Sequence, residues 1–365
     1  MSSVLTNAIL SMDSYNRGYG AAVLLSGNQI GNYQISGNSS SLGQAIFNGQ
    51  LVDRDEIIGF HATSYSYNGA TIISFRGTDQ MSLIPNPYTD LDVAHGWSLG
   101  AGNIASEQGK MAIEYYQHVA GANANLQTAN IALTGHSLGG GLAGYIGAIY
   151  GKSASIYDSM DYTQAALKVW QYATTSDPLL ADTKQQIIED VYAGNNPWLL
   201  NSTGVDAYHL EGEALDSDFI RYVPSQAYAI GSDVTLNPVD RHSASTLVMA
   251  IYAQDLTNQS WNYAAKHMWP VLYNDGFAQS IGMNDARVDG VSQNIGEYSD
   301  ILRTILAYSA IDEGERPFGD TAIRALYDDA NDLGAVLNSP YTSKNLVDAA
   351  DDISKAFVQY AGQLA

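Results

Sequence analysis

Cysteine is absent from the 365 residues of this chain. Its absence excludes disulfide bridges, thiolate metal sites and a cysteine nucleophile, and it does not identify a cellular compartment. Long hydrophobic runs are also missing: the longest weakly polar stretch, residues 138–151, is rich in glycine and shorter than a membrane-spanning helix requires. Residues 1–19 contain neither a basic segment nor a continuous apolar one, so the sequence predicts no ordinary signal peptide.

Positive charge is scarce as well. The chain has 16 Lys and Arg against 38 Asp and Glu, which gives a formal net charge of −22. Such a surface repels polyphosphate, and it disfavours an anionic membrane unless a local apolar face overcomes the repulsion. We therefore expect a soluble protein without a nucleic-acid partner, with only transient contact to a lipid interface. The pattern predicts no particular oligomeric state.

The hydrophobic pattern predicts an α/β fold. It indicates helices at residues 4–15, 107–119 and 138–150 and strands at residues 57–66, 70–75, 131–133 and 205–210. The pair Asn68-Gly69 predicts a hairpin turn between two of these strands. Residues 18–49, rich in Gly, Ser and Asn, are expected to be loop with weak strand. Strands that alternate with helices favour a mixed or parallel sheet.

One pentapeptide points to nucleophilic catalysis. Residues 135–139 read Gly-His-Ser-Leu-Gly, with an apolar strand before them and a glycine-rich helix after them. This context is the one that the G-x-S-x-G nucleophile elbow requires, because the serine sits on a sharp turn where neighbouring side chains would clash. Ser137 is the predicted nucleophile, and the amide of Leu138 at the helix N-terminus is a predicted oxyanion donor.

A second segment strengthens this interpretation. Arg76-Gly77-Thr78 follows directly on the strand that ends at Phe75, and residues 93–97 read Val-Ala-His-Gly-Trp. With the elbow, these segments resemble the class 3 lipases over residues 56–150. The resemblance implies an α/β-hydrolase fold with a mostly parallel sheet, and Thr78 as an oxyanion donor. His95 is expected to be structural, because the catalytic histidine of these hydrolases follows the serine.

The base and the acid are sought after Ser137 in the chain order serine, acid, histidine. His242 lies in a loop before an apolar helix and is the predicted base, whereas His209 comes too early and His267 falls inside a helical stretch. Laying the class 3 lipase acid segment on residues 211–216 places Glu213 at the acid position. Asp216 is the alternative, and Asp218 is a further fallback.

The rest of the chain exceeds a minimal hydrolase. We expect a catalytic α/β-hydrolase domain over residues 1–255, with a cap insertion at 158–203, and a helical extension over 256–365 that packs on it. Candidate acyl-binding or lid residues, for which ordinary burial in a cap is an equal alternative, are Trp170, Tyr172, Trp198, Leu199, Leu200 and the loop 82–88.

The acidic tail segments 312–320 and 328–332 resemble stretches that follow the lipase modules of large bacterial RTX-type secreted proteins. The resemblance implies a secreted module of a longer chain, with the cytoplasm as the alternative. The G-G-x-G-x-D repeats of those proteins are missing, and the Asp clusters do not fit an EF-hand loop, so no calcium site is predicted.

Together these motifs predict a serine carboxylester hydrolase, a lipase or esterase, that cleaves acyl esters through an acyl-enzyme without a metal or an organic cofactor. Phospholipase A1 or acyltransferase activity uses the same machinery and is an alternative. A catalytically silent hydrolase-fold binding module is the alternative from outside the enzymes.

Overall fold

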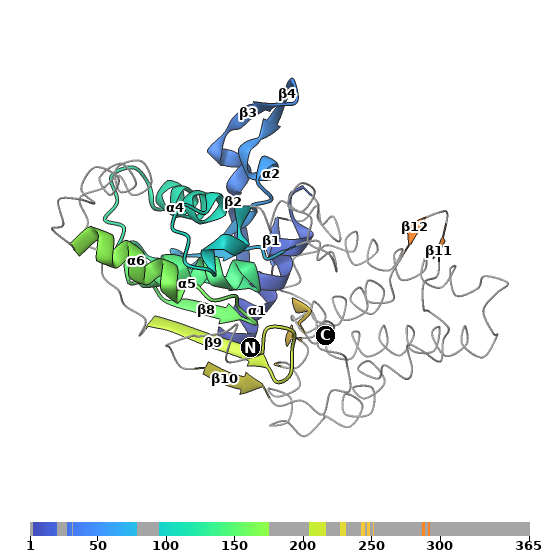
Figure 1. Cartoon of the computed structure of the whole chain (residues 1–365), viewed down its shortest axis with the longest axis vertical. Coiled ribbons are helices and arrows are strands. Elements are labelled where there is room, and N and C mark those ends of the chain that lie inside the picture. Colours follow the sequence, from blue (N-terminus) through green and yellow to red (C-terminus); the bar gives the residue numbers. More distant parts are fainter. Residues whose placement is uncertain are drawn as a thin grey trace.

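A mixed sheet forms the centre of the computed structural model (Figure 1). The structure describes residues 3–19, 28–30, 32–78, 95–174, 204–216, 227–230, 242–244, 247–248, 251, 287–288 and 291–292. Within that part of the chain, the largest sheet has the strand order β1-β2-β5-β6-β7-β8-β9-β10. These strands are β1 Gln29–Ile30, β2 Tyr33–Asn38, β5 Ala62–Tyr67, β6 Ala70–Phe75, β7 Ile131–His136, β8 Ala154–Tyr157, β9 Val205–Leu210 and β10 Ala227–Ile230.

The sheet has a parallel half and an antiparallel half. Strands β6 to β10 run parallel to one another, whereas β1, β2 and β5 pair antiparallel with their neighbours. Two further hairpins stand apart from it, formed by β3 Gln44–Phe47 with β4 Gln50–Asp53 and by β11 Arg287–Val288 with β12 Val291–Ser292.

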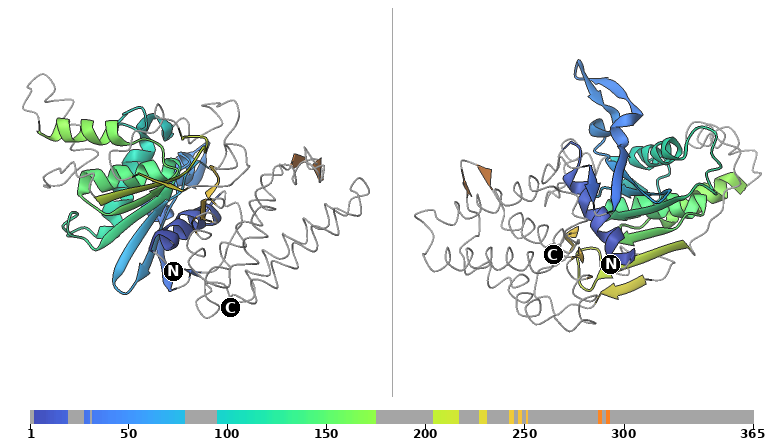
Figure 2. Two further views of the ribbon diagram at one scale, coloured as in Figure 1. Left: turned by 90° about the horizontal axis from the view of Figure 1, so that it is seen from below. Right: turned by 180° about the vertical axis from the view of Figure 1, so that it is seen from behind.

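Helices cover both faces of the sheet (Figure 2). Helix α1 Ser3–Asp13 packs on β6, β7 and β8 from one side, and α5 Leu138–Tyr150 packs on the same strands from the other. Helices α4 Glu107–Ala120 and α6 Thr163–Thr174 lie against α5. Short helical turns occur at η1 Ser14–Asn16, η2 Ser39–Leu42, α2 Arg54–Ile57 and η3 Trp97–Leu99.

The centre of this arrangement is β7 with α5. Nearly every residue of β7 is buried, as expected for a parallel strand that is covered on both faces. All residues of α5 are buried, and their small or apolar side chains let the helix lie close to the sheet. Helix α4 is bounded at its start by Ser106, whose side chain accepts a hydrogen bond from the Gly109 amide.

Most sequence-predicted elements are confirmed. The expected strands 70–75 and 205–210 coincide with β6 and β9, and the expected helix 138–150 coincides with α5. Helix 107–119 differs from α4 by one residue, and the strand predicted at 131–133 continues to 136. The hairpin turn at Asn68-Gly69 is confirmed as well, with φ of 50° and 76° at the two residues.

Three predictions needed correction. The strand expected at 57–66 begins only at Ala62, because α2 and the turn that follows it occupy residues 54–59. Residues 18–49, expected to be loop with weak strand, contain the three strands β1, β2 and β3, so their strand content was underestimated. Strand β8 was missed: it lies between the expected helix 138–150 and the expected cap 158–203, in which α6 is the described helix.

The expected C-terminal extension is described only at β11 and β12, which are strands rather than helix. The remainder of residues 256–365 lies outside the described residues, as do residues 82–88, Trp198, Leu199 and Leu200. In the part of the chain that the structure describes, no helix is both long enough and apolar enough to span a bilayer.

Candidate active site

The sharp turn predicted at Ser137 is confirmed. Ser137 connects β7 to α5 with φ 57° and ψ −125°, a conformation that residues with side chains rarely adopt and that is concentrated at functional sites. The two glycines of the motif are required by close packing. A Cβ atom on Gly135 would overlap the backbone of Gly139, and one on Gly139 would overlap the backbone of Phe75.

His242 and Glu213 form a hydrogen-bonded chain with Ser137. His242 Nε2 lies 2.8 Å from Ser137 Oγ, and His242 Nδ1 lies 2.5 Å from Glu213 Oε2. All three residues are buried, with exposed fractions of 4% for Ser137, 6% for His242 and 3% for Glu213. A carboxylate only accepts hydrogen bonds, so Nδ1 donates to Glu213 and Nε2 is left to accept the Ser137 hydroxyl proton.

The loop after β9 presents Glu213 to the histidine. Glu213 Oε2 also accepts a hydrogen bond from the Leu215 amide at 2.8 Å. The alternative acid Asp216 points elsewhere: its carboxylate accepts from the Gly212 amide at 2.6 Å and lies 3.6 Å from His209 Nε2. Asp216 thus stabilises the loop that carries Glu213. Asp218 lies outside the described residues.

The structure places the other histidines considered from the sequence as follows. His95 Nδ1 lies 2.6 Å from Glu107 Oε2 at the start of α4, an arrangement that fits its expected structural role. His209 belongs to β9, and His267 lies outside the described residues.

The end of β6 passes beside the serine. A Cβ atom on Gly77 would lie 3.0 Å from Ser137 Cβ, and Thr78 is the next residue along the chain. Trp97 Nε1 donates a hydrogen bond to Thr78 Oγ1 at 2.9 Å. Because the indole nitrogen can only donate, Thr78 Oγ1 is the acceptor, and the hydroxyl keeps its own proton for another acceptor. The amide of Leu138 begins α5, at the positive end of the helix dipole.

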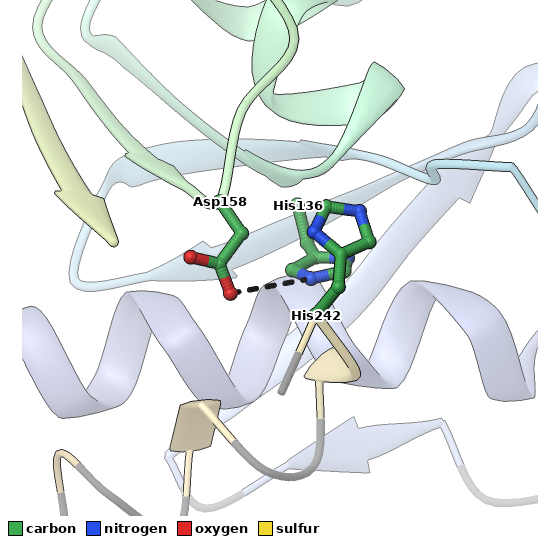
Figure 3. Close-up of side chains that lie close together, drawn as sticks. All are labelled: His136, Asp158 and His242. Carbon is green, nitrogen blue, oxygen red and sulfur yellow. Dashed lines mark ion pairs between the residues drawn. The ribbon is translucent and has the colours of Figure 1, made fainter. Parts of the chain in front are cut away.

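A second buried histidine packs against His242. The rings of His136 and His242 have centroids 5.0 Å apart. His136 Nδ1 is hydrogen-bonded to the Tyr15 hydroxyl at 2.9 Å, and its Nε2 lies 3.9 Å from Asp158 Oδ2. Figure 3 shows the Asp158 carboxylate directed toward the His136 ring, with His242 beside it. Asp158 is fully buried and also accepts a hydrogen bond from the Leu210 amide at 2.9 Å.

Comparison with known protein families adds an independent line of evidence. The model for the Tle-like phospholipase domain matches residues 6–228, which is more than half of the chain. The chain belongs to this family. Tle-like phospholipase domains are lipase-like hydrolases, so the match identifies the chain as a lipolytic hydrolase at the level of its class. Comparison with curated proteins finds no match.

In this Tle-like phospholipase domain, the matched residues include Ser137 and Glu213, whereas His242 lies beyond the matched range. The assignment of His242 to the site therefore rests on the chain-order argument and on its hydrogen bond to Ser137.

Sequence reasoning missed three residues around the site of the Tle-like phospholipase domain. Tyr15 reaches His136 from the turn after α1, and Trp97 contacts Thr78 from η3. Asp158 follows β8, a strand that was not predicted, with φ 40°. Arg76 helps to fix the Tyr15 segment, since its guanidinium donates to the carbonyl of Tyr19 at 2.7 Å. Arg76 and Trp97 lie in segments that the sequence marked, but their partners could not be predicted, because each contact joins separate segments of the chain.

Metal binding is one chemistry that this cluster could support. Ligand atoms of His136, Asp158 and His242 lie within 4.8 Å of one another. However, both ring nitrogens of His242 already face Ser137 and Glu213, so a bound metal would have to break one of these contacts. The geometry therefore favours a hydrogen-bonding role for the cluster.

Proposed function

We propose that this chain is a serine carboxylester hydrolase that acts on phospholipids, with Ser137 as nucleophile, His242 as general base and Glu213 as the carboxylate that orients the base. The observation that carries the proposal is the continuous contact from Ser137 Oγ through both nitrogens of His242 to Glu213, over 2.8 Å and 2.5 Å. The strained conformation of Ser137 and the family match support it.

In the proposed first step, His242 Nε2 takes the proton of the Ser137 hydroxyl while Ser137 Oγ forms a bond to the ester carbonyl carbon. The tetrahedral intermediate collapses as the bond to the leaving alkoxide breaks, and the imidazolium of His242 returns the proton to that oxygen. Water then attacks the acyl-enzyme with His242 again as base, which releases the fatty acid and restores Ser137.

Negative charge develops on the carbonyl oxygen in both steps, and two donors are suited to stabilise it. We assign them to the Leu138 amide at the N-terminus of α5 and to Thr78 at the end of β6. The hydrogen bond from Trp97 supports the assignment of Thr78, because it orients the hydroxyl as a donor. This chemistry needs no metal and no organic cofactor.

The family match favours a phospholipid substrate over a neutral acyl ester, and we therefore propose phospholipase activity in preference to general esterase activity. A serine nucleophile of this kind attacks the acyl carbon, which corresponds to phospholipase A activity and includes the A1 alternative. We also propose that the chain has the α/β-hydrolase fold of the class 3 lipases. The parallel strand order β6-β7-β8-β9 around Ser137 supports this. An acyl acceptor other than water would make the enzyme an acyltransferase.

Hydrolysis of p-nitrophenyl butyrate and of phosphatidylcholine tests this proposal. We expect the parent to release fatty acid and lysophospholipid, and we expect Ser137→Ala and Glu213→Gln to lower kcat by about 10³-fold or more. Asp216→Asn is the matched control: it removes a neighbouring carboxylate that braces the loop, and kcat should stay within about tenfold of the parent.

Other outcomes overturn parts of the proposal. Release of phosphocholine or choline instead of fatty acid would assign the cleavage to a phosphate ester. Full activity of Ser137→Ala would remove Ser137 as the nucleophile. The silent binding-module alternative is separated by a fluorophosphonate probe, which should label Ser137 in the parent and should not label a silent module.

A further inference from the structure

The hairpin of β3 and β4 stands apart from the main sheet and projects from the described fold in Figures 1 and 2. Its strands pair from Gln44 with Asp53 to Phe47 with Gln50. The two turn residues, Asn48 and Gly49, have φ of 51° and 79°, as a tight two-residue hairpin turn of type I′ requires. The tip is therefore a defined structure.

Large apolar side chains are exposed at this tip. Ile46 and Leu51 pair directly across the two strands and are 79% and 66% exposed, and Phe47 beside them is 46% exposed. Side chains alternate between the faces of a strand, so Ile46 and Leu51 share one face and Phe47 lies on the other. A two-stranded ribbon is at best marginally stable in water by itself, and such a tip gains stability when a partner covers it.

Side-chain contacts connect the base of the hairpin to the rest of the fold. Arg54 Nη1 donates to the Leu42 carbonyl at 3.2 Å, and Arg54 Nη2 lies 3.0 Å from a Glu114 carboxylate oxygen on α4. Ser39 Oγ donates to the buried Asp55 carboxylate at 2.6 Å. The Arg54–Glu114 ion pair is partly exposed and contributes little, so the buried Ser39–Asp55 hydrogen bond is the stronger contact in this support of the tip.

This support lies at the same edge of the sheet as Ser137. The hairpin leaves from the end of β2 and returns to the start of β5, where Asn38 and Thr63 are paired. Ala62 at that start pairs with Phe75 at the end of β6, which in turn pairs with Gly135 near the end of β7. Ser137 follows directly after β7, so both roots of the hairpin belong to the edge that carries the nucleophile.

The charge of the hairpin fits a neutral lipid surface. Residues 45–52 contain no charged side chain, and Asp53 at the base accepts a hydrogen bond from Gln44 at 2.8 Å. The chain as a whole carries a net charge of −22, which opposes approach to an anionic surface. An uncharged apolar tip on an acidic protein therefore matches a zwitterionic phospholipid interface, where no charged group of the tip has to be dehydrated.

We propose that Ile46, Phe47 and Leu51 insert into the surface of zwitterionic phospholipid aggregates and bring the Ser137 edge of the sheet to the lipid. This inference rests on the proposed function, because that function supplies the lipid substrate. It assigns the contact with the interface to a hairpin, whereas the sequence placed its lid candidates in residues 82–88 and 158–203.

Binding of the full chain to phosphatidylcholine vesicles tests the proposal, with Ser137→Ala as the background so that the lipid stays intact. We expect Ile46→Ser with Leu51→Ser to weaken cosedimentation with the vesicles by about tenfold or more. Two matched controls are Gln50→Ser in the same hairpin and Tyr67→Gln, which replaces a 38% exposed aromatic side chain at the opposite end of β5. Both controls should bind as Ser137→Ala alone does.

Activity with Ser137 intact separates this inference from the proposed function. The double variant should hydrolyse soluble p-nitrophenyl butyrate at the parent rate, which also shows that it folds, and should lose about tenfold in rate on phosphatidylcholine vesicles. Added phosphatidylglycerol should weaken binding at low salt.

Equal vesicle binding by the double variant and its parent overturns the inference, as does a parent that does not bind vesicles. A parent dimer that the double variant dissociates, seen by analytical ultracentrifugation, would assign the tip to a second copy of the chain instead. Absence of any ester hydrolysis by the parent would contradict the proposed function, whatever the vesicle binding shows.

Discussion

At the scale of single residues, His242 has two carboxylates nearby, whereas the proposed reaction needs only one to orient the base. Glu213 contacts one ring nitrogen, and the carboxylate of Asp158 is close to the same histidine across the His136 ring. When His242 takes a proton from Ser137, it becomes a cation in a buried site. A second carboxylate nearby favours that cation because the interaction is poorly screened there.

Asp158→Asn should therefore lower kcat on p-nitrophenyl butyrate by about tenfold, which corresponds to about 1.4 kcal/mol, with little change in KM. Asparagine keeps an oxygen for the Leu210 amide, so the loss would report on the charge rather than on the fold. Steady-state kinetics of the two proteins give this comparison. An unchanged kcat would mean that the role of Asp158 is limited to its hydrogen bond with the Leu210 amide of β9.

At the scale of elements, local sequence patterns predicted those elements whose formation depends on near neighbours. Helix α5 and strand β6 carry continuous patterns and were found at their predicted bounds. Strand β8 has only four residues, and its burial between β7 and β9 is a property of the sheet, which no short window of sequence contains. Strand β2 gave only a weak pattern, because none of its residues is fully buried and Gln34, Ser36 and Asn38 are polar.

The short helix η3 illustrates how such an element serves the site. It places the indole of Trp97 against Thr78 at the end of β6. Trp97→Phe removes this donor and keeps most of the apolar ring, so the Thr78 hydroxyl loses its fixed orientation. We expect kcat to fall by about 3- to 10-fold, less than the loss seen when an oxyanion donor itself is deleted.

Tyr67→Phe, which also removes one hydrogen-bond donor from an aromatic side chain but at the opposite edge of the sheet, is the control for this change and should leave kcat unaltered. The comparison requires kcat values from soluble ester, since a vesicle substrate would add binding effects. Equal rates for Trp97→Phe and the parent would show that the hydrogen bond from Trp97 is not needed to orient the Thr78 hydroxyl.

At the scale of the whole molecule, stability should depend on pH through a histidine that takes no part in the proposed reaction. Burial, and then the positive charge of Arg76, lower the pKa of His61 from 6.5 to about 3. The unfolded chain therefore binds a proton at His61 that the folded chain does not bind between these pH values. The free energy of unfolding consequently falls as the pH decreases from 6.5 toward about 3.

Thermal unfolding of the parent and of His61→Gln from about pH 7 to about pH 4 measures this contribution. Glutamine does not titrate and can still bond to Thr63, so the Tm of the variant should fall less steeply with acid. His118→Gln, which changes an exposed histidine on α4, should keep the slope of the parent. Identical slopes for the parent and His61→Gln would contradict the expected effect.

The candidate site was predictable from sequence to the extent that it depends on chain order and on one motif. Ser137 was marked by its glycines, and His242 and Glu213 followed from the order serine, acid, histidine. Choosing Glu213 over Asp216 required the resemblance, since both carboxylates lie in one short loop. Tyr15 was out of reach because its contact with His136 spans 121 residues and depends on the packing of α1.

The separation of Ser137 and His242 has a consequence for synthesis of the protein. His242 follows the serine by 105 residues, so a ribosome adding about 5–20 residues per second needs a further ~5–20 s to reach it. On the proposed assignment, a nascent chain that has already formed the β7–Ser137–α5 turn lacks its base during that interval. On that assignment, no nascent chain that ends before His242 can catalyse lipolysis, so translation itself sets the earliest time at which activity can begin.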